Sequence, residues 1–589
     1  MEELTHTLRN TVDDKSNGTS YEYQPLSDPE GIRLLSIQPG KGSSEITCRL
    51  LTVSLAESPD YEALSYTWGN NYKSKHIRYE ENLLPVTSNL HSALQRLRHV
   101  DKPRLLWADA ICINQDDIPE RNQQVQLMQR IYQQAREVLI WLGEEHESDA
   151  ETFRFMNQFG ELNIRFHAEL HTPQSNQELL HLVSFSSLPR KGIADLLQRP
   201  WFSRMWVIQE IAMASKATIF CGSFSTTWGA ASKMIQLMRD RGDFVYLGPP
   251  SALSISRIGF MTMMKEQIKT EGKMELSLPD VLRSTPSFSS TDPRDRIFAM
   301  LGLIRGPDTL DMLPDYSRSN EDVFKDIAIR SFSLEGGGFE MLSLAGGVSN
   351  AALNVPSWAP GWIPDPRSII GLDGQYNTAL DSAPAFSFSN DLNWVNAVLG
   401  TMGEDRNALI LGYQFEIDFF KECEAIASIS NPYPTGEDFA EAYTRLLIGD
   451  LKIFEGLASS PQQSLKDGYE YWRYTQDHLE DILAQRLNKQ DKKMLSSQSE
   501  AGKLYHKAID VAIFGKKFCR TEKRYLGWVG AEAQPGDIVC IFLGASVPYV
   551  LRSENNGFYK LVGECYVHGI MYGETLIAGL PSSQEFHIT

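Results

Sequence analysis

Two acidic residues of this chain stand at positions where α/β proteins carry chemistry. The stretch from about 200 to 215 predicts a helix, and in it Glu210 has no cationic neighbour three or four positions away; those neighbours are Trp206, Val207, Met213 and Ala214. A carboxylate along an apolar stripe beside an indole loses hydration, which disfavours its charged form and is typical of functional carboxylates. The alternative is a structural Glu210 paired with a distant cation such as Arg199 or Arg294.

Asp109 directly follows a predicted strand at 105–108, and open α/β sheets bind ligands beyond the carboxyl ends of their strands. Ser65, Tyr66 and Trp68 end the preceding strand in the same way, and their side chains could form a stacking wall for a planar ring. The alternative is that Asp109 caps the following turn and that the aromatic rings pack in the core.

The sequence lacks the motifs that mark other classes of enzyme and of binding site. The sequence has no phosphate-binding loop of the Gly-x-x-x-x-Gly-Lys-Ser/Thr type, no His-Glu-x-x-His, no Gly-x-Ser-x-Gly and no Cys or His cluster at metal spacing, so no metal site is predicted. Glu120 is explained by a capping box that begins at Asp117, and Cys112 by packing as a small apolar residue. Neither is assigned a catalytic role.

The composition of the chain indicates which partners are disfavoured and in which compartment the protein is expected. The formal charge of −19 (56 basic and 75 acidic residues) disfavours binding to nucleic acid, which depends on clustered Lys and Arg. Seven dispersed cysteines without a CxxC pair indicate reduced thiols in an intracellular compartment. The polar N-terminal segment lacks the apolar core of a signal peptide, and no apolar run reaches the length of a membrane span. A cytoplasmic protein without a membrane span is expected.

The pattern of elements predicts an α/β first domain around a mainly parallel sheet flanked by helices. It consists of a hairpin at 32–55, buried strands at 61–66, 105–108, 138–142 and 217–221, and helices that begin near Thr87 and Asp117. A mostly helical middle region and a small β-rich C-terminal region follow. The expected division is a flexible tail at 1–30, a first domain at 31–225 with an insertion at about 148–195, a helical region at 226–345, a mixed region at 346–505 and a β-rich region at 506–589.

Three Trp-bearing segments in the first third, at 61–69, 106–115 and 199–210, resemble in order and character the fungal heterokaryon incompatibility (HET) domain. Segments at 292–298, 314–317, 358–362 and 563–569 are similar to those of long filamentous-fungal members of this group. HET domains in turn resemble Toll/interleukin-1 receptor (TIR) domains, some of which cleave NAD. Here 63–66, 107–109 and 138–142 resemble three TIR strands, and 203–211 resembles the segment with the catalytic Glu.

The resemblance implies a TIR-like fold and a role in non-self recognition and programmed cell death. It places Glu210 in the catalytic position of an NAD glycohydrolase of the TIR-like type, with Tyr66, Trp68, Asp109 and Trp206 around the nucleotide. NAD would be a substrate, and no cofactor is expected. The implied partners are an incompatible allelic or non-allelic protein and further copies of this chain, through self-association of the HET domain.

Three functions therefore fit the sequence. The first is an incompatibility effector that causes cell death by consuming NAD. The second is a signalling module without enzymatic activity, in which the same domain recruits partners by self-association. The third is a regulatory or passenger protein of a fungal gene cluster. The first two differ at the carboxylate of Glu210.

Overall fold

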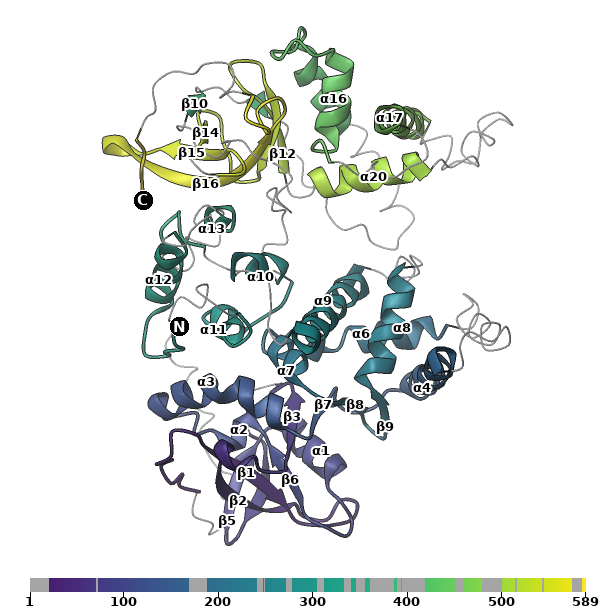
Figure 1. Ribbon diagram of the computed structural model, residues 1–589, viewed down its shortest axis with the longest axis vertical. Coiled ribbons are helices and arrows are strands. Elements are labelled where there is room, and N and C mark those ends of the chain that lie inside the picture. The colour runs from purple at the N-terminus through teal and green to yellow at the C-terminus, as the bar shows by residue number, and fades with distance from the viewer. Residues whose placement is uncertain are drawn as a thin grey trace, which may run out of the picture. The chain divides into compact units, whose positions relative to one another are not determined.

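A computed structural model gives the fold of the chain (Figure 1). It describes residues 21–589 except 70–71, 169–187, 241–246, 248, 272–277, 286, 305–311, 333–339, 346–354, 361–385, 389–392, 395–418, 452–459, 479–499, 514–515, 543–544 and 575–584. The chain divides into two compact units. The first contains residues 1–274 together with 298–303 and 313–317, and the second contains 275–297, 304–312 and 318–589.

The first unit is built on a nine-stranded mixed sheet with the order β5-β4-β2-β1-β6-β3-β7-β8-β9. Its centre is parallel: β6, β3, β7 and β8 pair in register with one another, and the outer pairs β1–β2, β4–β5 and β8–β9 are antiparallel. The strands are β1 (Gly31–Ile37), β2 (Thr47–Ser54), β3 (Glu62–Tyr66), β4 (Lys75–Tyr79), β5 (Asn82–Val86), β6 (Arg104–Trp107), β7 (Glu137–Trp141), β8 (Ala217–Cys221) and β9 (Phe224–Thr227).

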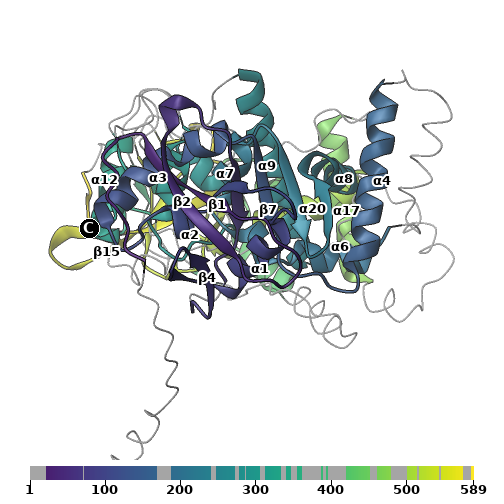
Figure 2. The ribbon, with the colours of Figure 1, turned by 90° about the horizontal axis from the view of Figure 1, so that it is seen from below.

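The helices of the first unit begin where the sequence supplies caps. The Thr87 hydroxyl accepts from the Leu90 amide at the start of α1 (Ser88–Leu97), and the Asp117 carboxylate accepts from the Glu120 amide at the start of α3 (Ile118–Gln134). The remaining helices are α2 (Asp109–Cys112), α4 (Asp149–Ala168), α6 (Arg190–Leu197), α7 (Val207–Met213), α8 (Trp228–Asp240) and α9 (Pro249–Glu271). Figure 2 shows α4, α6 and α8 together to one side of the parallel strands.

One anchor of the predicted insertion lies at the end of β7, and α4 also meets the outer strand β9, where the Asn157 side-chain amide donates to the Ser225 carbonyl at 3.0 Å. The Arg199 guanidinium donates to Asp149 Oδ2 at 2.7 Å and to the carbonyls of Leu142 and Glu144, at the end of β7. The Asp149 side chain is fully buried, and it also accepts from the Cys221 thiol at 3.1 Å. The two ends of the insertion, at α4 and at Arg199, therefore meet beside the sheet.

The second unit combines helices with an eight-stranded, mostly antiparallel sheet. The sheet contains β10 (Phe386–Phe388), β11 (Asn393–Trp394), β12 (Lys516–Arg520), β13 (Leu526–Gly530), β14 (Ile538–Ile541), β15 (Tyr549–Ser553), β16 (Phe558–Val567) and β17 (His587–Ile588). The helices are α10 (Leu278–Ser284), α11 (Asp295–Leu301), whose last turn belongs to the first unit, α12 (Asn320–Phe332), α13 (Glu340–Ser343), α16 (Phe439–Leu447), α17 (Pro461–Asp477) and α20 (Glu500–Ile513). Aromatic side chains of α17, α20 and β13, led by Trp472, Tyr505 and Trp528, form its core.

The predicted fold class is confirmed, because an α/β first region, a helical middle and a small β-rich end follow one another along the chain. The domain boundaries given above stay a prediction. Within the predicted tail, residues 1–20 lie outside the described residues, whereas the Tyr23 hydroxyl donates to the Ile111 carbonyl at 2.9 Å.

Two local predictions were wrong. The single helix expected at about 200–215 is a 3-10 turn at Pro200–Ser203 followed, after a break at Arg204 and Met205, by the short α7. The Glu120 carboxylate does not complete a capping box: it pairs with the buried Arg33, at 2.5 and 2.8 Å, and accepts from the Asn114 amide. A buried guanidinium far away in sequence outcompetes the local amide for this carboxylate.

Candidate active site

The candidate site lies at the carboxyl ends of β3 and β6, two neighbouring parallel strands. Ser65 and Tyr66 are the last two residues of β3, and Asp109 begins α2 after β6. Glu210 comes from the first turn of α7. Open α/β sheets hold their ligands at this edge.

Glu210 is fixed through the Ser65 hydroxyl. The Ser65 hydroxyl donates to Glu210 Oε2, and the Trp201 indole N–H donates to the same Ser65 oxygen at 2.7 Å. All three residues are at most 2% exposed. Because an indole N–H can only donate and an ionised carboxylate can only accept, the hydroxyl hydrogen points to Glu210 when Glu210 is ionised. Ser65 is therefore a dedicated donor to one carboxylate oxygen.

The other carboxylate oxygen faces a cation that the sequence did not reveal. Arg204 Nη1 lies 4.0 Å from Glu210 Oε1 and donates to the carbonyl of Tyr66. The arginines considered from the sequence bind elsewhere: Arg199 pairs with Asp149, and Arg294 with Asp292 at 2.7 Å. The prediction that no cation lies three or four positions from Glu210 was right, but Arg204, six positions before it, reaches the carboxylate across the break between the 3-10 turn and α7.

Burial raises the pKa of Glu210 from 4.5 to about 7, and the charge of Asp109 also acts to raise it. The Arg204 charge and the hydrogen bond from Ser65 act in the opposite direction. The desolvation therefore outweighs a cation that is close but not hydrogen-bonded. A carboxyl group that titrates near neutral pH can both hold a proton and stabilise developing positive charge.

Asp109 lies against Trp68 and near Tyr66. The Trp68 indole N–H donates to Asp109 Oδ2 at 2.8 Å, and Asp109 Oδ1 accepts from the Ala110 amide at 2.8 Å. Tyr66 is 1% exposed; burial raises its pKa well above the ordinary value, and the Asp109 charge raises it further. The structure thus brings Tyr66, Trp68 and Asp109 together beside Glu210 and Arg204. Their binding of a nucleotide stays a prediction.

Trp206 is joined to the site through the backbone. It precedes α7 as its N-cap residue, its side chain is half-buried, and its carbonyl accepts from the Glu210 amide at 3.1 Å. Its part in nucleotide binding also stays a prediction.

Sequence reasoning missed Trp201 and Arg204 as site residues. Both belong to the third Trp-bearing segment, so the signal was present, but an uninterrupted helix would have turned them away from Glu210.

Metal and thiol chemistry receive no support from the described part of the chain. There, no group of three or more His, Cys, Asp or Glu side chains is arranged to hold a metal ion. The seven cysteines are free and buried, and burial raises the pKa of Cys112 to about 12, which agrees with its assignment as an apolar packing residue.

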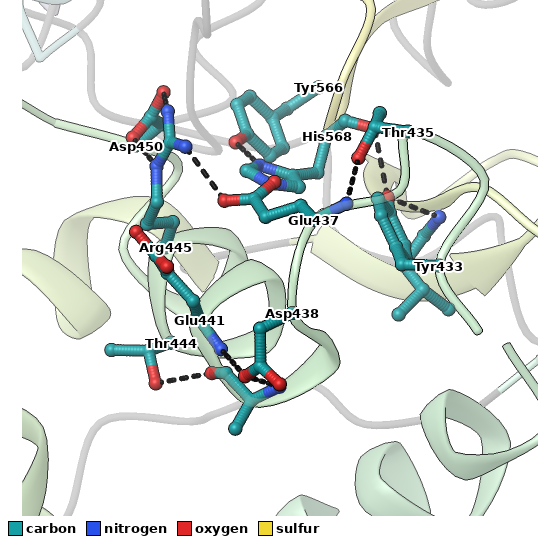
Figure 3. A network of polar contacts seen from close by, with 12 residues as sticks. Tyr433, Thr435, Glu437, Asp438, Glu441, Thr444, Arg445, Asp450, Tyr566 and His568 are labelled. Carbon is teal, nitrogen blue, oxygen red and sulfur yellow. Dashed lines mark hydrogen bonds and ion pairs between the residues drawn. The ribbon is translucent and has the colours of Figure 1, made fainter. Parts of the chain in front are cut away.

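A second network of titratable side chains, buried at His568 and partly exposed at Arg445, lies in the second unit (Figure 3). His568 Nδ1 contacts the Tyr566 hydroxyl at 2.8 Å, and His568 Nε2 contacts Glu437 Oε2 at 3.0 Å. Glu437 Oε1 accepts from Arg445 at 2.8 Å, and Arg445 also makes a two-pronged contact with Asp450, at 2.7 Å to each oxygen. This network joins the end of β16 to α16 and the loop before it.

Comparison with known proteins identifies two regions of the chain. Residues 61–210 match the model of the family described as "Heterokaryon incompatibility protein (HET)", and residues 435–588 match that of the "Het-6 beta-barrel domain". The chain is 25% identical to "Heterokaryon incompatibility protein 6, OR allele" of Neurospora crassa over an alignment that is 678 positions long, gaps included, and covers 97% of this chain and 98% of the relative. No solved structure matches. Within the described residues, no helix is both long and apolar enough to cross a membrane.

Proposed function

We propose that this protein, which belongs to the heterokaryon incompatibility (HET) domain family, is a cytoplasmic non-self recognition protein whose HET domain triggers programmed cell death by cleaving NAD. The observation that carries the proposal is the carboxyl group of Glu210: it is buried at the carboxyl edge of a parallel sheet, it has one dedicated donor, and its pKa is raised to about 7. Such tuning is common at catalytic carboxylates.

In the proposed reaction, the Glu210 carboxylate holds the hydroxyls of the ribose that carries nicotinamide. The bond between ribose C1′ and the nicotinamide nitrogen breaks, and its electron pair leaves with nicotinamide. Positive charge develops on the sugar, where the carboxylate stabilises it. Water then adds to C1′ and releases a proton. Ser65 and Arg204 keep the carboxylate oriented toward this charge.

The site as described is closed, since Glu210 is 2% exposed. We expect self-association of the HET domain, or contact with an incompatible allelic or non-allelic partner, to open or complete the site before NAD enters. The relative's name, with its "OR allele", motivates a search among allelic partners first.

The same burial supports a second candidate function, in which the domain signals by association alone. Glu210 would then be a structural carboxylate that joins α7 to β3, and its pairing with Ser65 fits this role as well.

The experiment is expression of the full chain in a fungal host, with and without candidate incompatible partners, and measurement of NAD level and viability. Glu210→Gln and Glu210→Ala are compared with Glu57→Gln, which changes an exposed carboxylate of the same unit. We expect the unaltered chain and Glu57→Gln to deplete NAD and kill cells, and both Glu210 variants to do neither. Killing by a folded Glu210 variant without NAD loss would establish the associative function instead.

A further inference from the structure

Two segments downstream of the HET match, at 292–298 and 314–317, have no assigned role, yet residues of both belong to the first unit. Residues 298–303 and 313–317 pack with the first unit, whereas the residues that flank them on both sides belong to the second. We call these two stretches the docking segments. Phe298, Ala299, Met300 and Leu303 are buried in the first of them, and Tyr316 in the second. The docking segments are thus integral parts of the unit that carries Glu210.

The first docking segment lies against the helix that carries Glu210. A side-chain carbon at Gly302 would stand 2.2 Å from Gln209 Nε2 and 3.4 Å from Gln129 Cβ. Gln209 is the residue before Glu210 and is 2% exposed. A side chain at position 302 would therefore force the end of the buried Gln209 side chain, or the segment itself, to shift.

The second docking segment binds the first turn of α3. The Tyr316 amide donates to Asn122 Oδ1 at 2.9 Å, and Asn122 Nδ2 donates to Asp315 Oδ1 at 3.0 Å. The Arg121 guanidinium lies 3.9 Å from the centre of the Tyr316 ring, and the same ring meets Phe298 edge to face at 5.1 Å. The two docking segments therefore contact each other, and they meet α3 at Arg121 and Asn122 and near Gln129; α3 in turn packs on α7.

We propose that the docking segments position Glu210, with Gly302 as the positioning residue that acts through Gln209. The inference rests on the proposed function of Glu210 and adds its regulation. Each docking segment is joined by the chain to the second unit at both ends. A partner that binds the second unit can thus displace α7, and with it the Glu210 carboxylate from Ser65, without touching the HET match.

The test measures the proton on Glu210 directly. Infrared difference spectra against pH give the midpoint of its carboxyl band, which is assigned by its loss in Glu210→Gln. Gly302→Ala is compared with Gly229→Ala, whose added methyl meets no atom within 4 Å. We expect Gly302→Ala to raise the midpoint, because α7 moves the carboxylate away from its donor, and to lower NAD turnover roughly tenfold or more. Gly229→Ala should change neither.

Two further variants test whether Gly302 acts on Glu210 through Gln209 and whether the second docking segment also positions Glu210. Gln209→Ala removes the amide that the new methyl meets, so Gln209→Ala/Gly302→Ala should return the midpoint toward that of Gln209→Ala alone. Asn122→Ala removes the hydrogen bonds that hold the second docking segment on α3. It should therefore move the midpoint in the same direction as Gly302→Ala. If Gly302→Ala does not fold, Asn122→Ala is measured in its place. An unchanged midpoint in both Gly302→Ala and Asn122→Ala would overturn the inference. If the midpoint moves while no variant cleaves NAD, positioning stands and the proposed enzymatic function fails.

Discussion

The pKa of a glutamate is shifted in opposite directions in two polar networks of the described residues, one buried around Glu210 and one partly buried around Glu437. Glu210 has one hydrogen bond from a hydroxyl and a guanidinium at 4.0 Å, and burial raises its pKa to about 7. Glu437 has a hydrogen bond from His568 that holds its pKa below the ordinary value against the effect of burial, with help from Arg445. A carboxylate whose two oxygens both accept hydrogen bonds from nitrogen donors is typical of a structural link, whereas one that is buried with incomplete pairing is available for chemistry.

The largest effect is expected for Glu210→Gln, whose change in the free energy of unfolding should depend on pH in the opposite sense to that of Glu437→Gln. The folded-state pKa of Glu210 lies above its unfolded value of 4.5, so its favourable contribution is present below pH 4.5 and is lost as the pH rises through about 7. Glu210→Gln should therefore be more stable than the unaltered chain by about 3 kcal/mol at pH 8, and equal to it near pH 4.5. Urea unfolding followed by Trp fluorescence measures this difference, with Glu57→Gln as the control.

A Glu210→Gln variant that is less stable at pH 8 would contradict the comparison. It would mean that the Ser65 and Arg204 contacts outweigh desolvation and that this carboxylate, like Glu437, is a structural link.

Glu437→Gln should have the opposite sign and a smaller size. Because the pKa of Glu437 is lowered in the folded state, its stabilisation is present above pH 4.5 and is lost as the pH falls through the lowered value. Removal of the charge should cost about 2 kcal/mol at pH 7, since charge-assisted bonds to His568 and Arg445 are weakened. Thermal unfolding of the full chain at pH 7 and pH 4 checks this. A loss that is equal at both pH values would show that packing, not charge, holds the network.

The smallest effect is expected for Ser65→Ala, which tests how far the Ser65 hydrogen bond lowers the pKa of Glu210. Ser65→Ala removes the donor and should raise the pKa of Glu210 by about one further unit. The midpoint of its carboxyl infrared band measures the shift. Ser203→Ala serves as the control, because the Ser203 hydroxyl donates only to the Pro200 carbonyl in the neighbouring turn. An equal midpoint in the two variants would remove Ser65 from the site.

Local signals predicted most of the fold. The side chains of Thr87 and Asp117 cap helices as expected, and the apolar runs form the strands, because caps and periodicity act over a few residues. The break at Arg204 was missed, since a 3-10 turn and an α-helix share nearly the same pattern at this length. That break is what places Arg204 and Trp201 beside Glu210.

The sequence predicted which residues form the site, but it did not predict the hydrogen bonds and ion pairs between them. Glu210, Asp109, Tyr66 and Trp68 do gather at one sheet edge, as parallel strand ends require. The donor role of Ser65 and the partner of Glu120 depend on residues 145 and 87 positions away, which no local pattern encodes. Likewise, Gly302 gives no sign in the sequence of its approach to Gln209.

The ion pair between Arg199 and Asp149 bears on how this domain can diverge. The pair brings the two ends of the segment between them together at the end of β7. The free energy of closing such a loop changes only slowly with its length. An insertion or deletion inside this segment therefore changes the free energy of closing it only slightly, as long as Arg199 and Asp149 stay paired.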